Sequence, residues 1–197
     1  MHIPVQLNLN DLEEHPTNPE TATIAVGLAR TRTEMARQAA AGPQPGPTEL
    51  GILGRELGRL ADGLRLSGQT QEAQEAFEEV ITLWDDMGRL RAAFMARMRL
   101  ALLHRASGHP DKAHALLDQL CAHCAHDPTV AMYHSFALHH RGIAAWKSGR
   151  HHDALEDLQR ALDMRRSKGS KPLIDATTAV LKHLQILHSG ACPESIP

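Results

Sequence analysis

The chain has 197 residues, of which 42% are hydrophobic and 22% are charged, enough for one domain or a short array of repeats with a buried core. A formal net charge of −2 and an aromatic content of 3% argue against backbone or base contacts, so no direct nucleic-acid partner is expected. No apolar run reaches the length of about 18 residues that a membrane span needs, so no membrane partner is expected. The N-terminus lacks the pattern of a secretory signal, and three cysteines are too few for a disulfide scaffold, which predicts a cytoplasmic location.

Caps and breakers in the sequence predict one N-terminal helix followed by a row of further helices. Residues 1–17 are expected to be irregular. Asn18, followed by Pro19 and an acidic residue, is typical of a helix start and predicts a helix over 18–41. Residues 42–48 form a linker, because its prolines and glycines are incompatible with a helix. Further helices are expected near residues 49–67, 70–87, 90–107, 110–125, 128–148 and 151–167, with a last helix to about residue 188 and a tail over 191–197.

A period of about 40 residues runs through the chain after the linker. Gly68, Gly108 and Gly149 are spaced 40 and 41 residues apart. Each predicts the end of a first helix, where a left-handed residue closes the helix without a Cβ penalty. Small residues before and after each glycine predict close contact between two helices, and these residues are Ala61, Ala101, Gly142, Ala73, Ala113 and Ala154. A bulky apolar residue lies nine positions after each glycine, and these residues are Phe77, Leu117 and Leu158.

These columns resemble the tetratricopeptide repeat, and the third copy, from Gly142 through Trp146 and Gly149 to Ala161, matches it best. Two features depart from that repeat. The period exceeds the usual value of about 34 residues, and the aromatic position four before the glycine holds Leu64, His104 and Ala145. Long-period repeats of this kind resemble those of kinesin light chains and bacterial peptide-sensing regulators. The resemblance implies an all-α fold, a right-handed solenoid of helical hairpins with about three and a half repeats over residues 49–190, plus the N-terminal helix.

In tetratricopeptide-like arrays the first helix of each repeat lines a concave groove. Carried over by position relative to each glycine, the groove residues are Arg55, Arg65, Met95, Met98, Leu102, Arg105, Phe136, His139, Ile143, Trp146 and Lys147. The resulting groove is apolar and basic, which suits a protein or peptide segment with apolar and acidic side chains. The alternative for Met95, Met98 and Phe136 is ordinary packing between helices.

Nothing in the sequence carries catalysis. Phosphate loops, nucleophile elbows, dinucleotide fingerprints and zinc-protease motifs are missing, so the chain is predicted to be non-enzymatic and to need no cofactor. The leading interpretation is a protein-binding adaptor. The alternative is a small-ligand or metal-responsive sensor that uses the groove or the His/Cys clusters, with His114, Cys121 and Cys124 as candidate ligands. Against a metal, both cysteines continue the apolar stripe of their helix, where a free cysteine behaves as a small hydrophobe.

The N-terminal segment complements the predicted groove. Val5, Leu7 and Leu9 alternate with polar residues, and acidic residues, including Glu14, follow them. One hypothesis is that this segment, or its copy in a partner chain, lies in the groove when no ligand is bound. The alternative is a disordered or edge-packing terminus. A homodimer is a further expectation, because the helix over 18–41 either pairs with a second copy or caps the array.

Overall fold

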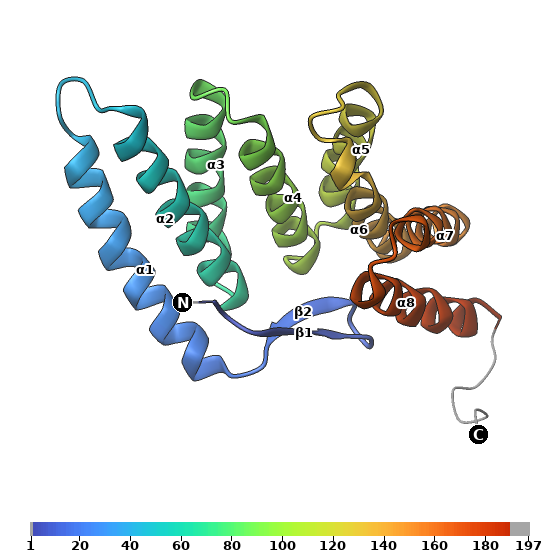
Figure 1. Cartoon of the computed structure of the whole chain (residues 1–197). Coiled ribbons are helices and arrows are strands. Elements are labelled where there is room, and N and C mark those ends of the chain that lie inside the picture. Colours follow the sequence, from blue (N-terminus) through green and yellow to red (C-terminus); the bar gives the residue numbers. More distant parts are fainter. Residues whose placement is uncertain (1, 190–197) are drawn as a thin grey trace. The chain divides into compact units, whose positions relative to one another are not determined.

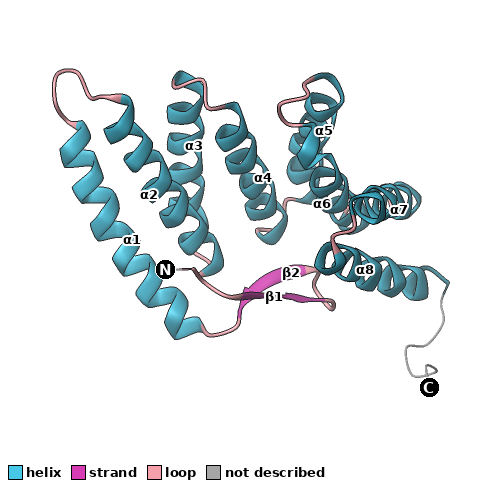
Figure 2. Cartoon of the chain, in the orientation of Figure 1, coloured by secondary structure: helices cyan, strands magenta, loops and turns pink. Residues whose placement is uncertain are grey.

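The computed structural model describes residues 2–189, in which eight α-helices account for most of the chain and one β-hairpin holds the strands (Figure 2). The chain divides into two compact units (Figure 1). The first unit comprises Met1–Asn8 and Glu13–Leu103, and the second comprises Leu9–Leu12 and His104–Pro197. The expected tail over 191–197, with Cys192, lies outside the described residues.

The first unit holds a hairpin and the first four helices. Its elements are β1 (Val5–Asn8), β2 (Glu13–Pro16), α1 (Pro19–Ala40), α2 (Pro47–Leu66), α3 (Thr70–Asp86) and α4 (Leu90–Ala106), the last of which ends in the second unit. Consecutive helices pack side by side, α1 on α2 and α2 on α3. Phe77 and Val80 of α3 are fully buried in the core of this unit, together with Leu57 and Leu64 of α2.

The start of the chain is more ordered than the sequence predicts. Residues 5–8 and 13–16 form an antiparallel hairpin in which Leu7 lies opposite Glu14, and β2 contacts α1 and α2. The alternation at Val5 and Leu7 was a correct strand signal, but the expectation of an irregular segment was wrong. Strand pairing depends on cross-strand and tertiary neighbours, which a local pattern does not reveal.

The first two helices begin at residues that favour a helix start. Asn18 Oδ1 accepts hydrogen bonds from the backbone N–H groups of Glu20 (2.9 Å) and Thr21 (3.3 Å), so α1 begins where the sequence predicts. The second helix begins at Pro47, with Gly46 as its N-cap residue, so it starts two residues before the expected residue 49. Proline favours the first helical position, because the backbone N–H that it lacks would have no partner within the helix there. This preference explains the earlier start.

The second unit continues the row of helices. Its elements are α5 (Pro110–His126), the 3-10 turn η1 (Ala131–Tyr133), α6 (His134–Lys147), α7 (His151–Lys168) and α8 (Lys171–Ser189). Here α5 packs on α6, α6 on α7 and α7 on α8. The helix expected from residue 128 begins six residues later, because Asp127 Oδ1 accepts from the N–H of Thr129 at 2.7 Å and holds a turn. Val130, in the same connection, is fully buried.

The repeat columns have the roles that the sequence predicts. Gly68, Gly108 and Gly149 follow α2, α4 and α6 with φ values of +72°, +79° and +78°. All five alanines of the small columns are fully buried. A Cβ atom added to Gly142 would lie 2.9 Å from the Ala154 carbonyl oxygen, which shows how closely α6 and α7 approach. The three repeats are therefore formed by α2 and α3, by α4 and α5, and by α6 and α7, and α8 is the first helix of a fourth repeat.

Candidate functional site

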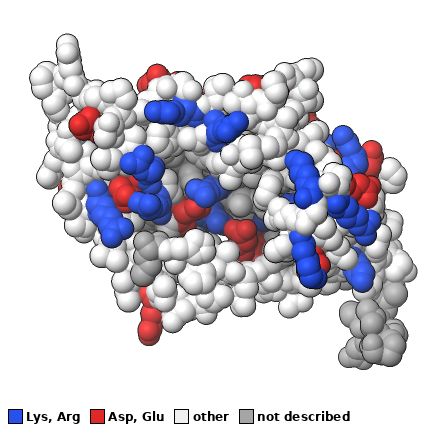
Figure 3. Space-filling view, in the orientation of Figure 1, with Lys and Arg blue, Asp and Glu red and all other residues white. Residues whose placement is uncertain are grey.

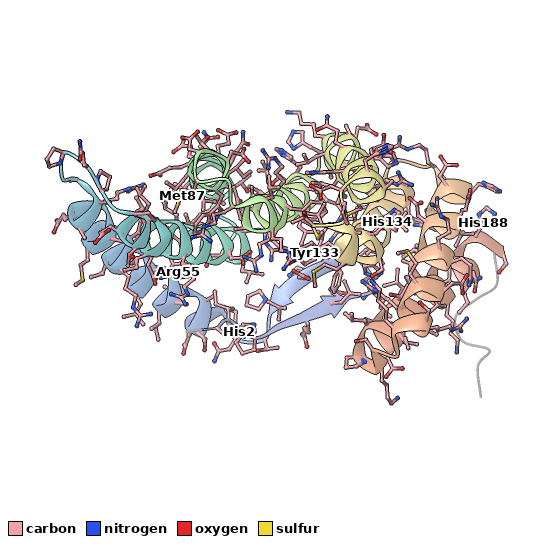
Figure 4. All side chains as sticks on the ribbon, turned by 45° about the horizontal axis from the view of Figure 1, so that its top comes forward. His2, Arg55, Met87, Tyr133, His134 and His188 are labelled. Atoms are coloured by element: carbon pink, nitrogen blue, oxygen red, sulfur yellow. The ribbon has the colours of Figure 1, made fainter. Side chains whose placement is uncertain are left out.

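All eleven predicted groove residues lie on the first helices of the repeats. Arg55 and Arg65 belong to α2, the next four residues belong to α4, and the remaining five, from Phe136 to Lys147, belong to α6. Arg55 is exposed on α2 and is labelled in Figure 4. The helix on which each residue lies therefore agrees with the pattern carried over from tetratricopeptide-like arrays. The eleven residues differ, however, in how far their side chains are exposed to solvent.

Apart from the exposed Arg55, burial divides the other ten residues into two groups. Five are buried, and these are Met98, Leu102, Arg105, His139 and Ile143. Five are half-buried, and these are Arg65, Met95, Phe136, Trp146 and Lys147. A buried side chain stabilises helix packing, and a bound segment reaches it only after a local rearrangement. In the structure as described, Arg55, Met95, Phe136, Trp146 and Lys147 keep accessible surface, whereas the Arg65 side chain is largely covered.

Arg65 is the centre of a charge network in the first unit. Its Nη2 donates to Glu14 Oε2 of β2 at 3.0 Å, and its Nε lies 3.5 Å from Asp62 Oδ1. Asp62 Oδ2 in turn lies 3.1 Å from Arg99 Nη1 of α4. On the face drawn in Figure 3, basic and acidic side chains lie beside each other in places on a surface that is otherwise free of charged residues. Ion pairs thus join α2 to α4 and α2 to β2.

Two aromatic side chains of α6 have partners within the second unit. Trp146 stacks on His151 of α7 with ring centroids 4.2 Å apart, and His188 of α8 meets the Trp146 ring edge-on at 6.3 Å. The Arg165 guanidinium lies 5.1 Å from the centre of the Phe136 ring. Such aromatic and cation–π contacts orient both rings. Each ring still keeps part of its surface accessible.

His139 is a buried histidine in the second unit. Its Nδ1 lies 3.3 Å from Thr177 Oγ1 of α8, and Thr177 also accepts from Arg165 and donates to the Leu173 carbonyl oxygen. Burial, together with the smaller effects of the charges of Arg165 and Arg105, lowers the pKa of His139 to about 3. Imidazole is therefore neutral at physiological pH, and His139 is a packing residue in this state.

We expect stability to fall in acid because of His139. In the unfolded chain this histidine is protonated below about pH 6.5, whereas in the folded chain it is protonated only below about pH 3. The free energy of unfolding therefore decreases as the pH drops from about 6.5 to about 3. The slope from this residue approaches about 1.4 kcal/mol per pH unit. Urea unfolding of wild type, His139→Gln and the exposed control His152→Gln measures it. A wild-type slope that His139→Gln leaves unchanged would contradict the assignment.

Comparisons with known proteins decide the family. Profiles described as tetratricopeptide repeat match residues 50–128 and 137–168, together more than half of the chain. The chain belongs to the tetratricopeptide repeat family. The first matched segment contains Gly68 and Gly108, and the second contains Gly149. The resemblance predicted from the repeat columns is confirmed.

Solved structures agree with this tetratricopeptide fold. Two structures of a Podosopora anserina putative kinesin light chain with nearly identical TPR-like repeats are similar to the chain, and one of them is a point variant. The variant has a TM-score of 0.59 at 20% identity and covers 89% of this chain and 90% of its own. The other has a TM-score of 0.56 at 21% identity, with coverages of 88% and 89%. At such identities the likeness shows the fold alone. No curated protein matches the chain.

Two further observations on this tetratricopeptide repeat chain concern membrane spans and metal sites. Among residues 2–189, no helix combines the length and the apolar character that crossing a bilayer requires. In the same range, no three His, Cys, Asp or Glu side chains are grouped as a metal ion would need. The candidate ligand His114 is half-buried, and burial lowers its pKa, followed by the charge of Arg150.

Both candidate cysteine ligands are buried thiols. Burial raises the pKa of Cys121 to about 12 and that of Cys124 to about 11. Cys124 also donates from Sγ to the Val130 carbonyl oxygen at 3.3 Å. Because zinc binds thiolates, a metal at this pair would have to deprotonate two groups that burial keeps protonated.

Zinc is therefore not expected to stabilise the protein through Cys121 and Cys124. We expect one equivalent of Zn²⁺ to shift Tm equally in wild type and in Cys121→Ala/Cys124→Ala, because a ligand stabilises only the fold that holds its site. Thermal melts with and without Zn²⁺ measure it. A rise in Tm that the double variant abolishes would instead support the metal-responsive sensor.

Sequence reasoning missed the polar residue that joins three helices of the second unit. Arg141 of α6 donates from Nε and Nη2 to the two carboxylate oxygens of Asp157, each at 2.7 Å, and from Nη1 to Asp118 at 2.6 Å. Asp157 lies on α7 and Asp118 on α5. Arg141 directly precedes Gly142, where α6 and α7 approach closely. The small residue at position 142 was therefore the sequence signal that a charged neighbour such as Arg141 could reach an acidic residue of α7.

Proposed function

We propose that this tetratricopeptide repeat chain is a non-enzymatic adaptor that binds a protein segment through the first helices of its repeats. Membership of the repeat family is the observation that carries the proposal, because its fold is built from helices that present extended surfaces to partners. The position of every predicted groove residue on α2, α4 or α6 supports it.

The chemistry of the accessible residues favours a segment with apolar and acidic side chains. Arg55 and Lys147 supply positive charge, and Met95, Phe136 and Trp146 supply apolar surface that remains partly accessible. Methionine adapts to irregular shapes, while tryptophan and arginine are enriched where interfaces gain most of their binding energy. Partner recognition by electrostatic and apolar contacts requires no cofactor.

A second copy and a cytoplasmic location also belong to this proposal. Helix α1 exposes Ile24, Leu28 and Met35, which recur at helical spacing on one stripe, and such a stripe supports pairing with another chain. Light scattering of wild type and Met35→Glu tests the dimer. A monomeric wild type would remove it from the proposal and leave the adaptor role untouched.

Matched charge reversals test the adaptor role. Two immobilised double variants are compared. Arg55→Glu/Lys147→Glu reverses charges on the first helices α2 and α6, and Lys112→Glu/Arg160→Glu reverses the same number of charges on the second helices α5 and α7. Both variants must first keep the wild-type melting temperature. We expect partners from native lysate, identified by mass spectrometry, to be lost only from the first variant. Retention by both variants would overturn the assignment to the first helices.

A further inference from the structure

The binding surface of the first unit already holds a segment of the chain itself. Glu14 Oε2 of β2 accepts a hydrogen bond from Arg65 Nη2 at 3.0 Å. Arg65 is one of the predicted groove residues, and its side chain is only 7% exposed, so the carboxylate of Glu14 covers a guanidinium that is otherwise almost removed from water. A charge-assisted hydrogen bond at such a site is stronger than one on an open surface.

The occupied site leaves part of Arg65 unsatisfied. Its Nε is buried without a hydrogen-bond acceptor, because Asp62 Oδ1 lies 3.5 Å away without hydrogen-bonding geometry. Asp62 Oδ1 is likewise buried without a hydrogen bond. A guanidinium binds a carboxylate best through two parallel N–H groups. Glu14 uses one of them, so a carboxylate placed beside both Nε and Nη2 would satisfy this arginine more completely.

The segment that carries Glu14 is suited to leaving. Each strand of the hairpin has four residues, and a two-stranded hairpin of this kind is marginally stable without the surface beneath it. The base of the hairpin is closed by Thr17, whose N–H donates to the Pro4 carbonyl oxygen at 3.0 Å. Ile3 lies beside α2, with Cδ1 3.8 Å from the place of a Cβ atom on Gly63. Local opening of such a short element would leave the helices in place and return the buried Leu12 and Glu13 to solvent.

We propose that Asp62, Arg65 and Arg99 form a site for an acidic side chain on an extended segment, and that Glu14 occupies this site until a partner displaces the hairpin. The inference rests on the proposed function, because it assigns the ligand and the regulation of the same first helices. Arg99 lies 3.1 Å from Asp62 and keeps that carboxylate from repelling the incoming one. The partner is accordingly an extended acidic segment, as β2 is.

A cleavable full chain tests the site. A protease recognition sequence is inserted between Thr17 and Asn18, and the chain is cut after folding and freed of residues 1–17, with its melting temperature checked. A fluorescent peptide of residues 1–17 then reports binding by anisotropy. We expect Glu14→Gln in the peptide, or Arg65→Gln in the chain, to weaken binding about tenfold, as loss of a charge-assisted hydrogen bond does. The controls Gln6→Ala in the peptide and Arg59→Gln on the exposed side of α2 should change it little.

The two proposals fail in different ways. Equal affinity for the wild-type and Glu14→Gln peptides would overturn the site, whatever proteins the lysate experiment recovers. A segment mapped from a captured partner is expected to compete with the fluorescent peptide. A captured segment that binds without competing would overturn displacement while the adaptor role stands. Loss of all captured partners, with the Glu14 and Arg65 effects intact, would overturn the adaptor role and leave the site.

Discussion

Replacement of Asp157 by alanine is expected to lower the free energy of unfolding by about 3 kcal/mol, because it strands the Arg141 guanidinium between helices. Asp157 has a side chain that is 6% exposed and binds Arg141 through both oxygens. Arg141 is 17% exposed, and after the substitution it keeps only Asp118, whose side chain is 64% exposed. The remaining partner is largely solvated and compensates little.

A double variant separates the pair from its surroundings. In Arg141→Met/Asp157→Leu both charges are removed, and replacement of a buried ion pair by apolar side chains of similar size is often close to neutral. We therefore expect most of the stability lost in Asp157→Ala to return. Asp163→Ala, which removes an exposed partner of Arg166, serves as the control. Urea unfolding measures all of them, and an Asp157→Ala variant as stable as the control would contradict the account.

Substitution of Gly142 by alanine is expected to destabilise the fold by about 2 kcal/mol or more through overpacking. The new Cβ would lie 2.9 Å from both the Ala154 carbonyl oxygen and Leu158 Cγ, and 3.3 Å from Asp157 Cβ. A backbone oxygen does not move aside as a flexible side chain does, so α6 and α7 must separate to admit the methyl group.

Gly27 of α1 supplies the matched control. No atom lies within 4 Å of a Cβ built on Gly27, which also sits inside a helix. Gly27→Ala is therefore expected to stabilise the chain by about 0.5–1 kcal/mol, because alanine loses less backbone entropy in a helix than glycine. Thermal and urea unfolding of the two variants measure the difference. Destabilisation by both substitutions, to a similar extent, would contradict the close approach at Gly142.

The sequence predicted the helices and the repeats because their signals are local. Turn glycines, small columns and the Asn18 cap each act within one or two turns of helix. Gly88 and Gly169 also have positive φ and end α3 and α7, so the chain carries a second set of turn glycines beside Gly68, Gly108 and Gly149.

The accessibility of the candidate site was harder to predict than its position. A position relative to the turn glycine assigns a residue to the first helix, but its exposure depends on the neighbouring elements. His139 is buried because Thr177 of α8 and Arg165 of α7 cover it, and neither is near it in sequence. Arg65 is covered by Glu14, a residue 51 positions away. The complementarity of the acidic N-terminal segment was visible in the sequence, whereas its hairpin and its contact with Arg65 required the structure.

Site-specific photo-crosslinking tests the central claim most directly. A photoreactive phenylalanine analogue replaces Arg55, Met95 or Lys147 on the first helices, and Lys112 or Gln159 on the second helices, and each folded full chain is irradiated in native lysate. The account predicts covalent adducts with partner proteins from the three first-helix positions and none from the two controls. Adducts from Lys112 or Gln159, with none from the first helices, would contradict recognition through the first helices of this tetratricopeptide repeat chain.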